Sequence, residues 1–478
     1  MHVLVVGAYG SAGVAAADRL LGLADDDPSF DLRLTLVDDG DPGGGLCILD
    51  GCMPSKEMLS AAAHRFQARH DHRIRGTPEV DLEAVVATKE EHVESFASHR
   101  RAAVHEMAAR EGVEFLHARA EFVADGRVRV GDREFDPDYV VVATGSVPSV
   151  PDLPGMDTVD PMLSSDVLDA TDLPDSVVVM GFGYVGMELV PYLAEAGRTD
   201  VTVVEHDARP LDEADPAFGD ALLDLYRDAF DVEVLTHTYE RSVEATDDGV
   251  RLHLERSEPD DGGVPEELAV EAERLVTFTG RRPSLDGLGL ERAGLSPGEG
   301  WVEDTMQAAE SDRVFVVGDA NGREPVLHVA KEQGHRAAEN VLRHARETPL
   351  EPYENVHHHV VFSGLATYPY ARVGHSEASA REAGIEFEAV TRQASDDGVF
   401  ETKAHPEGLA SLVVGTDGTV LGYQGLHYHA DVMAKTMQVV VETGMDVRDV
   451  PDRAYHPTTP EILDGLFREA ADAVDAHR

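Results

Sequence analysis

Short apolar runs alternate with longer helical patterns along the chain, an arrangement typical of α/β proteins. The runs are rich in valine and leucine and end at glycine or polar residues, which predicts buried strands. They occupy residues 2–6, 34–37, 140–143, 177–180, 201–204 and 314–317. Residues 81–110 follow a helical period and predict one long helix with a solvated side. From about residue 349 the pattern changes to alternating strands and two helices, which indicates a separate C-terminal domain.

Two glycine-rich turns each connect a predicted strand to a predicted helix. They are Gly7-Ala8-Tyr9-Gly10-Ser11-Ala12-Gly13 and Gly181-Phe182-Gly183-Tyr184-Val185-Gly186. Such turns point backbone N–H groups and a helix N-terminus at a pyrophosphate. A later strand in each segment ends on an acid, Asp38 or Glu205, that can bind ribose hydroxyls. A lone turn of this type also occurs without any ligand, but two turns with two acids predict two dinucleotides.

The only two cysteines, Cys47 and Cys52, follow a glycine run. On a regular helix this spacing would separate their Cα atoms by about 7.5 Å in rise alone, which is too far for an unstrained disulfide. The segment must therefore bend, and Gly51 permits the bend. A helix that begins near Cys52, together with Lys56, would lower the thiol pKa and favour a reactive thiolate. Inert buried cysteines are the alternative, whereas a zinc site would need further ligands, so we expect no metal.

The charge of the chain is strongly acidic. Its 91 Asp and Glu residues against 40 Lys and Arg give a formal net charge of -51 and a pI near 4.6. Such a surface is typical of halophilic proteins, because molar salt shortens the Debye length to about 3 Å and screens self-repulsion. The excess argues against nucleic acid and anionic membranes as partners. We also find neither a targeting signal nor a membrane-length apolar run, and we expect a cytoplasmic protein.

These motifs, taken in order, resemble the two-cysteine pyridine nucleotide-disulfide oxidoreductases, the family of glutathione reductase and dihydrolipoamide dehydrogenase. The resemblance covers nearly the whole chain. Besides the first turn, its landmarks are the GGxxCxxxxCxPSK, ATG and GxGxxGxE patterns, Gly280-Arg281-Arg282-Pro283, Gly318-Asp319 and His456-Pro457-Thr458-Thr459-Pro460-Glu461. It implies an α/β fold with two Rossmann-like dinucleotide-binding domains and a C-terminal α+β dimerisation domain. The expected limits are 1–150 and 281–348 for FAD, 151–280 for NAD(P), and 349–478 for dimerisation.

The resemblance also implies a set of cofactor-binding residues. FAD would lie across the first fold, with its adenosine ribose on Asp38 and its ribityl chain on Asp319, and NAD(P)H would lie on the second fold. Tyr184 would gate the nicotinamide pocket, and Lys56 would lie near the flavin and pair with Glu188. A merely structural salt bridge is the alternative for that pair. The remaining expected cofactor-binding residues are Gly7, Gly10, Gly45, Thr144, Gly145, Gly181, Gly183, Gly186, Glu205, His206 and Gly280.

The same resemblance assigns the catalytic groups. Cys52 would exchange electrons with the flavin, and Cys47 would attack the substrate. His456 would be the acid-base, oriented by Glu461, as imidazole–carboxylate pairs commonly are. In the family this histidine reaches the cysteines of the other subunit, which implies a homodimer with shared active sites.

Several departures from the family pattern affect the expected flavin geometry. Leu49 replaces the usual asparagine, Asp50 occupies a normally apolar position, and the first glycine turn has either Tyr9 where a glycine is expected or one extra residue.

Two substrates remain after the cysteines are counted. Mercuric reductases and large thioredoxin reductases carry additional thiols, which makes them less similar, and an inactive flavoprotein is opposed by the retained catalytic groups. The remaining candidates are a small disulfide and dihydrolipoamide. Arg19, His335 and Arg336 lie about where glutathione reductase holds carboxylates. With the salt-adapted composition, they favour bis-γ-glutamylcystine and a role in thiol redox homeostasis.

The nicotinamide is nearly undecided from the sequence. Glu205 would bind a ribose 2′-hydroxyl and favours NADH, while His206 and Arg209 favour a 2′-phosphate. Because disulfide reductases of the family usually take NADPH, we expect NADPH slightly ahead of NADH.

Overall fold

The computed structural model describes residues 1–27, 30–257 and 265–476, which form two compact units. Unit 1 contains Met1–Pro54, Ala87–Ser149 and Arg281–Asn355, and unit 2 contains Ser55–Val86, Val150–Gly280 and Val356–Arg478. The chain passes between the units within helices α3 (Cys52–His70) and α4 (Leu82–Ala108), and again near residues 150, 281 and 356. The long helix predicted at 81–110 is thus confirmed as α4.

Unit 1 is built on a five-stranded parallel sheet in the order β17-β7-β1-β2-β3. Its strands are β1 (His2–Val6), β2 (Arg33–Asp38), β3 (Val113–His117), β7 (Tyr139–Val142) and β17 (Val314–Val316). Strand β1 is the central strand, and its alternate residues enter two different cores. Val3 and Val5 pack with helix residues, whereas Leu4 and Val6 pack with Phe122 of a smaller sheet. This alternation is the period of two expected of a strand buried on both faces.

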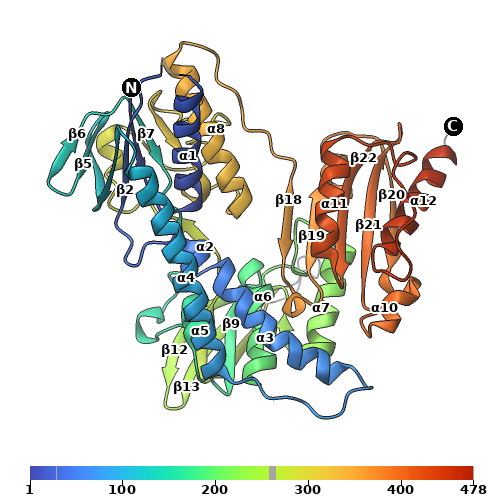
Figure 1. The fold of residues 1–478 in the computed structure, drawn as a ribbon. Coiled ribbons are helices and arrows are strands. Elements are labelled where there is room, and N and C mark those ends of the chain that lie inside the picture. Colours follow the sequence, from blue (N-terminus) through green and yellow to red (C-terminus); the bar gives the residue numbers. More distant parts are fainter. Residues whose placement is uncertain (28–29, 258–264, 477–478) are drawn as a thin grey trace. The chain divides into compact units, whose positions relative to one another are not determined.

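Helices α1 (Ser11–Asp26) and α8 (Leu327–Ala345) lie side by side in unit 1 (Figure 1). Small residues permit the close approach, since a side chain on Gly334 of α8 would lie 2.5 Å from the carbonyl oxygen of Ala12. The remaining elements of unit 1 are an antiparallel sheet of β4 (Ala120–Ala124), β5 (Arg127–Val130) and β6 (Arg133–Phe135), the pair β8 (Ser146–Pro148) and β16 (Arg281–Pro283), and α2 (Leu46–Leu49).

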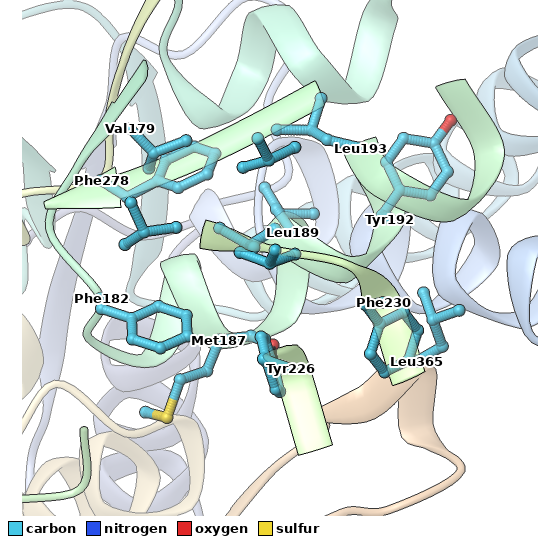
Figure 2. Packing of buried hydrophobic residues seen from close by; sticks show 14 of the residues in the cluster. Val179, Phe182, Met187, Leu189, Tyr192, Leu193, Tyr226, Phe230, Phe278 and Leu365 are labelled. Carbon is cyan, nitrogen blue, oxygen red and sulfur yellow. Dashed lines mark hydrogen bonds between the residues drawn. The ribbon is translucent and has the colours of Figure 1, made fainter. Parts of the chain in front are cut away.

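The first part of unit 2 repeats this plan. A parallel sheet has the order β11-β10-β9-β15, and an antiparallel sheet has the order β12-β13-β14. The strands are β9 (Ser176–Met180), β10 (Asp200–Val204), β11 (Glu233–Leu235), β12 (Thr238–Thr246), β13 (Gly249–Arg256), β14 (Glu266–Ala272) and β15 (Arg274–Thr277). Val179 packs with α6 (Tyr184–Tyr192) and α7 (Pro216–Phe230), as Figure 2 shows, while Val178 faces the antiparallel sheet. A short helix, α5 (Ser164–Asp169), precedes β9.

The C-terminal part of unit 2 is an antiparallel sheet in the order β18-β19-β22-β21-β20. Helices α11 (Ala430–Glu442) and α12 (Glu461–Ala476) pack against it through residues such as Met437 and Leu466. Its other elements are β18 (His358–Val361), β19 (Tyr370–Gly374), α9 (Glu377–Glu382), β20 (Phe387–Gln393), α10 (Gly398–Thr402), β21 (Gly408–Gly415) and β22 (Val420–His427). Within the described residues, every helix is too short or too polar to cross a lipid bilayer.

Candidate active site

The first glycine turn leaves the backbone at the N-terminus of α1 without side chains that cover it. Gly7 adopts a φ of +93°, and a side chain there would overlap the carbonyl oxygen of Ala143. Gly10 is the N-cap of α1, and a side chain on Gly45 would lie 3.0 Å from the Gly10 Cα. The predicted residues Gly7, Gly10 and Gly45 are therefore brought together in unit 1. Backbone N–H groups without side-chain cover at a helix N-terminus fit the pyrophosphate of a dinucleotide.

The irregular residue Tyr9 points away from this surface. Its side chain is only 4% exposed, and its ring occupies the space that a side chain on Gly43 would need. The Tyr9 N–H donates to Asp38 Oδ2 at 2.8 Å, and the Gly40 N–H donates to Oδ1 at 2.9 Å. Burial raises the pKa of Asp38, and these two hydrogen bonds partly offset that effect. Because a carboxylate oxygen can accept more than one hydrogen bond, Asp38 can still accept hydrogen bonds from a ribose.

Three more predicted flavin ligands gather at the end of β7. Ser146 Oγ donates to Asp319 Oδ2 at 2.6 Å, and Arg281 Nε donates to Ser146 Oγ at 2.9 Å. Thr144 Oγ1 is buried and has no hydrogen-bond partner among the described residues. A side chain on Gly145 would meet only open space. An orphaned hydroxyl beside open space fits a site whose polar ligand completes the hydrogen bonding.

The cysteine segment bends as predicted. Helix α2 ends at Leu49, and α3 begins at Cys52, so Asp50 and Gly51 separate two helices. Both cysteines are free thiols in this structure. The pKa of Cys47 is raised rather than lowered, first by its hydrogen bond with the Cys52 sulfur and then by burial. The expectation of a lowered thiol pKa concerned the start of α3 and stays a prediction for Cys52, whereas the Cys47 thiol in the dithiol form keeps its proton in the hydrogen bond with Cys52.

The predicted ion pair between Lys56 and Glu188 is confirmed in unit 2. Lys56 Nζ donates to Glu188 Oε2 at 2.6 Å and lies 4.6 Å from the centre of the Phe362 ring. The other carboxylate oxygen accepts the Phe362 N–H at 3.1 Å. Glu188 is thus held from two sides and fixes the direction of the ammonium group. The role of this pair beside a flavin stays a prediction.

The second glycine turn has the regular form. Gly181 adopts a φ of +93°, and Gly183 is the N-cap of α6. A side chain on Gly186 would lie 2.7 Å from the Gly181 carbonyl oxygen, so the turn and the helix pack directly on each other. Side chains on Gly183 or Gly280 would meet only open space. This surface fits a second dinucleotide.

The acid that follows the second turn is surrounded by paired charges. Glu205 Oε1 accepts the Asp207 N–H at 2.9 Å, and burial raises the Glu205 pKa. His206 Nε2 lies 2.6 Å from Glu240 Oε2, and the His206 ring stacks on Tyr239 at 4.8 Å. Arg209, the other expected phosphate ligand, donates to Asp220 at 2.6 Å. His206 and Arg209 therefore already have carboxylate partners.

The predicted acid-base pair is confirmed as a contact within unit 2. His456 Nδ1 lies 3.0 Å from Glu461 Oε2, and Glu461 Oε1 accepts the Thr458 N–H at 2.8 Å. The hydrogen bond with His456 lowers the pKa of Glu461. The His456 side chain is 82% exposed, so its Nε2 is accessible. Such an arrangement holds one imidazole nitrogen and presents the other to a reactant.

Two arginines expected to hold substrate carboxylates are engaged elsewhere. Arg19 donates to Glu339 at 2.8 Å and 3.0 Å, and Arg336 donates to Glu351 at 2.6 Å. The interpretation of Arg19 and Arg336 as a carboxylate clamp is therefore opposed by the structure. Glu339 and Glu351 already pair with the two guanidinium groups that the clamp would need for substrate carboxylates.

Unit 1 instead contains a basic groove that the sequence did not reveal. The groove has a volume of about 480 Å³ and lies among α1, α4 and α8. Its basic side chains are Arg100, Arg110, Lys331 and His335, of which Arg110 is paired with Asp25, and its acidic side chains are Asp18 and Glu106. Arg100 donates to the Tyr9 carbonyl at 2.9 Å and lies close enough to the Cys47 sulfur to act against the rise in the Cys47 pKa. The signal that could have found the groove is the pair Lys331 and His335, one helical turn apart on α8 of an acidic chain.

Comparison with known proteins defines the class. The model of the pyridine nucleotide-disulphide oxidoreductase family matches residues 1–334, and the model of its dimerisation domain matches residues 360–466. The chain therefore belongs to this family of flavoprotein disulfide oxidoreductases, and it is an enzyme whose cofactors are FAD and NAD(P)H. The predicted class of fold, the reaction class and the dimerisation domain are confirmed.

Its relatives include several activities. The chain is 30% identical to the dihydrolipoyl dehydrogenase of Halobacterium salinarum, over 99% of this chain and 96% of the relative. It is also 30% identical to the dihydrolipoyl dehydrogenase of Haloferax volcanii, over 97% and 94%. A mercuric reductase of Streptomyces lividans is 28% identical over 87% and 86%. The origin of the first two relatives agrees with the expected halophilic character.

Solved structures agree in fold. LpdA from Mycobacterium tuberculosis matches with a TM-score of 0.80 at 22% identity, over 98% of this chain and 99% of that chain. The HOCl-induced flavoprotein disulfide reductase RclA from Escherichia coli matches with a TM-score of 0.79 at 22% identity and the same coverage. Among residues 1–27, 30–257 and 265–476, no three His, Cys, Asp or Glu side chains are grouped to hold a metal ion.

Proposed function

We propose that this enzyme reduces a small anionic disulfide with NAD(P)H through a Cys47–Cys52 redox disulfide, and that bis-γ-glutamylcystine is the leading substrate. The overall reaction is NAD(P)H + H⁺ + RSSR → NAD(P)⁺ + 2 RSH. When bound, FAD supplies two-electron transfer between the nicotinamide and the enzyme disulfide. The observation that carries the proposal is a groove lined by Arg100, Lys331 and His335 in the unit that also contains the cysteine pair.

The protein residues then carry the thiol chemistry. The Cys47 thiolate attacks one substrate sulfur, which breaks the substrate S–S bond, forms a mixed disulfide and releases the first thiolate. His456, acting as an acid in the active site of the partner subunit, gives that thiolate its proton. Cys52 next attacks Cys47, which re-forms the enzyme disulfide and releases the second thiolate. Arg100 supports the ionised Cys47 before the first attack by its positive charge.

The charge of the groove supports an anionic substrate over a neutral one. Lys331 and His335 are exposed on α8 and line this groove. In a chain of net charge -51, Arg100 and Lys331 at one hollow attract carboxylates against the general field. A γ-glutamylcysteine disulfide carries several carboxylates, whereas the lipoamide ring and its amide arm carry none.

For the nicotinamide, the geometry favours NADH over the NADPH expected from the family. His206 and Arg209 are the candidates for a 2′-phosphate, yet each is paired with a carboxylate, Glu240 or Asp220. Glu205 stands at the strand end where a ribose 2′-hydroxyl would bind and where a 2′-phosphate would be repelled. NADH is therefore the cofactor that we propose.

Dihydrolipoamide oxidation is the second candidate. It is favoured by the two relatives at 30% identity, both named dihydrolipoyl dehydrogenases. Mercuric reduction and a non-catalytic role are less favoured, because no cysteines exist beyond Cys47 and Cys52 and the pairs Lys56–Glu188 and His456–Glu461 are formed.

A homodimer in the cytoplasm completes the proposal. Val432 and Val439, seven residues apart on α11, are 65% and 51% exposed. Apolar residues at this spacing share one helix face and suit burial by a second copy. Tyr455, next to His456, is 89% exposed and fits the same interface.

One assay in molar salt tests the proposal. It compares bis-γ-glutamylcystine, glutathione disulfide, lipoamide and mercuric ion with NADH and NADPH. Lys331→Gln should raise KM for the anionic disulfides by about tenfold, the worth of one charge-assisted hydrogen bond, and leave lipoamide unchanged. Arg19→Gln is the matched control and should change neither. Wild-type oxidation of dihydrolipoamide faster than reduction of any small disulfide would favour the second candidate.

A further inference from the structure

Tyr184 is the first residue of α6, and its hydroxyl contacts a carboxylate. The Tyr184 hydroxyl donates to Glu213 Oε1, and the Tyr184 ring lies 5.3 Å from the His359 ring at an angle of 31°. Glu213 itself is fixed through its backbone, because the buried Arg372 donates to the Glu213 carbonyl at 2.8 Å. Tyr184 therefore rests against an acceptor whose position is set by the surrounding fold of unit 2.

A second donor lies beside the same oxygen. His359, on β18, is 4% exposed, and its Nε2 lies 3.1 Å from Glu213 Oε1. Among the described residues, His359 Nε2 makes no aligned hydrogen bond. The other ring nitrogen, Nδ1, lies 2.7 Å from His357 Nε2. The buried Nε2 of His359 is thus a second donor, in poor alignment, beside the Glu213 oxygen that already accepts from Tyr184.

The protonation states make this nitrogen a donor. Burial lowers the pKa of His359, so the imidazole is neutral at pH 7. Burial alone would raise the pKa of Glu213, but the contacts with His359 and Tyr184 prevail and lower it to about 2. If His357 donates to Nδ1, the single proton of His359 is on Nε2, which faces the ionised Glu213. One carboxylate oxygen therefore has two neutral donors, and Tyr184 is the exposed one at 37%.

We propose that Glu213 and His359 are positioning residues that make Tyr184 a low-cost gate for the nicotinamide. Tyr184 rests on Glu213 in the closed state, and when it swings away, His359 Nε2 donates to the oxygen that Tyr184 leaves. Without His359, opening would leave the partly buried Glu213 carboxylate oxygen without a side-chain donor. That free-energy penalty would weaken dinucleotide binding. The inference rests on the proposed function in one respect only, namely that Tyr184 covers the nicotinamide site.

A double-mutant cycle on dinucleotide affinity tests the gate. The probe is the oxidised form of whichever nicotinamide dinucleotide the wild-type enzyme consumes, titrated into the FAD-loaded enzyme by calorimetry at fixed molar salt. His359→Leu should weaken binding about tenfold in the wild-type background, because the open state then lacks a donor for Glu213. In the Tyr184→Phe background the same change should have less than a twofold effect, because Glu213 has lost the tyrosine donor in both states.

Controls separate the gate from simple packing. His358→Leu alters the neighbouring, half-buried histidine of the same strand and should leave the affinity unchanged. His359→Gln, which can still donate, should recover most of the affinity lost in His359→Leu and serves if the leucine variant does not fold. Equal weakening by His359→Leu in both backgrounds, or no recovery by glutamine, would overturn the proposal. A wild-type enzyme that binds neither dinucleotide would instead refute the proposed function.

Discussion

The two dinucleotide-binding folds share one backbone solution. In each, a glycine with a φ of +93° follows the first strand, at Gly7 after β1 and at Gly181 after β9. Side chains at these positions would collide with carbonyl oxygens of a facing segment, that of Ala143 or of Phe278. Alternate residues of β1 and β9 also enter two separate cores in the same manner. The first strand and the first glycine of the turn are therefore equivalent in both folds.

The folds differ in the length of the turn. Gly183 is the N-cap of α6 and lies two residues after Gly181, whereas Gly10 is the N-cap of α1 and lies three residues after Gly7, so Tyr9 is an additional residue of the first turn. Tyr9 is tolerated because its ring lies in the space left by Gly43, which is distant in sequence. A glycine turn therefore requires a backbone path and room for each side chain, and a remote glycine can provide that room. In the proposed reaction the two folds hold different cofactors, and variants can separate their contributions.

The largest effect is expected at the acid-base. His456→Ala should slow disulfide turnover by roughly two to four orders of magnitude, the usual contribution of a positioned acid-base. Reduction of the bound flavin by NADH should be nearly unchanged, because that half-reaction does not use the proton. Stopped-flow absorbance measures the two half-reactions separately. A loss confined to flavin reduction would contradict the assignment of His456 to the disulfide half-reaction.

Alanine at the two equivalent glycines should separate the two cofactors. Gly7→Ala should lower the stability and FAD content of the purified protein, because a positive φ costs about 1–2 kcal/mol for alanine and the Ala143 carbonyl must also move. Gly181→Ala should retain FAD and raise KM for NADH by about tenfold or more. The absorbance ratio of flavin to protein and the steady-state KM report these effects. Equal FAD loss in both variants would contradict the assignment of FAD to the first fold and of the nicotinamide to the second.

The tyrosine and the remote glycine should be coupled. Gly43→Ala should destabilise the protein by about 1–3 kcal/mol, because its Cβ would overlap the Tyr9 ring. In a Tyr9→Ala background most of that cost should disappear, which a double-mutant cycle of denaturant unfolding measures. Additive effects would mean that Gly43 is required for another reason.

The smallest effect concerns the acid of the second fold. Because burial raises the Glu205 pKa, its ionised form lowers stability above its folded pKa, and this cost vanishes as pH falls below the ordinary value near 4.5. Glu205→Gln should therefore be slightly more stable than wild type at pH 7, with the difference closing toward pH 4.

Glu213→Gln should behave oppositely, since the Glu213 pKa of about 2 makes its ionised form stabilising above pH 4.5. Unfolding curves at fixed salt and several pH values test both signs.

The sequence predicted features that depend on local spacing. The bend between Cys47 and Cys52 follows from helix rise, and the His456–Glu461 contact joins residues of one short loop. Features that depend on distant side chains were not predictable in this way. Arg19 meets Glu339 across 320 positions, and no periodicity reveals such a partner. The accommodation of Tyr9 by Gly43 and the groove near Arg100 likewise arise only when separate helices and loops meet.

The most direct test of the central claim uses the small number of cysteines. Because Cys47 and Cys52 are the only thiols in 478 residues, the mass of the intact protein after alkylation reports the redox state of the pair. The oxidised, FAD-loaded enzyme should take up no iodoacetamide even when denatured. After anaerobic reduction by NADH it should take up two groups, and excess bis-γ-glutamylcystine should return it to none. Full alkylation without NADH, or none after it, would contradict the assignment of Cys47 and Cys52 as the redox pair.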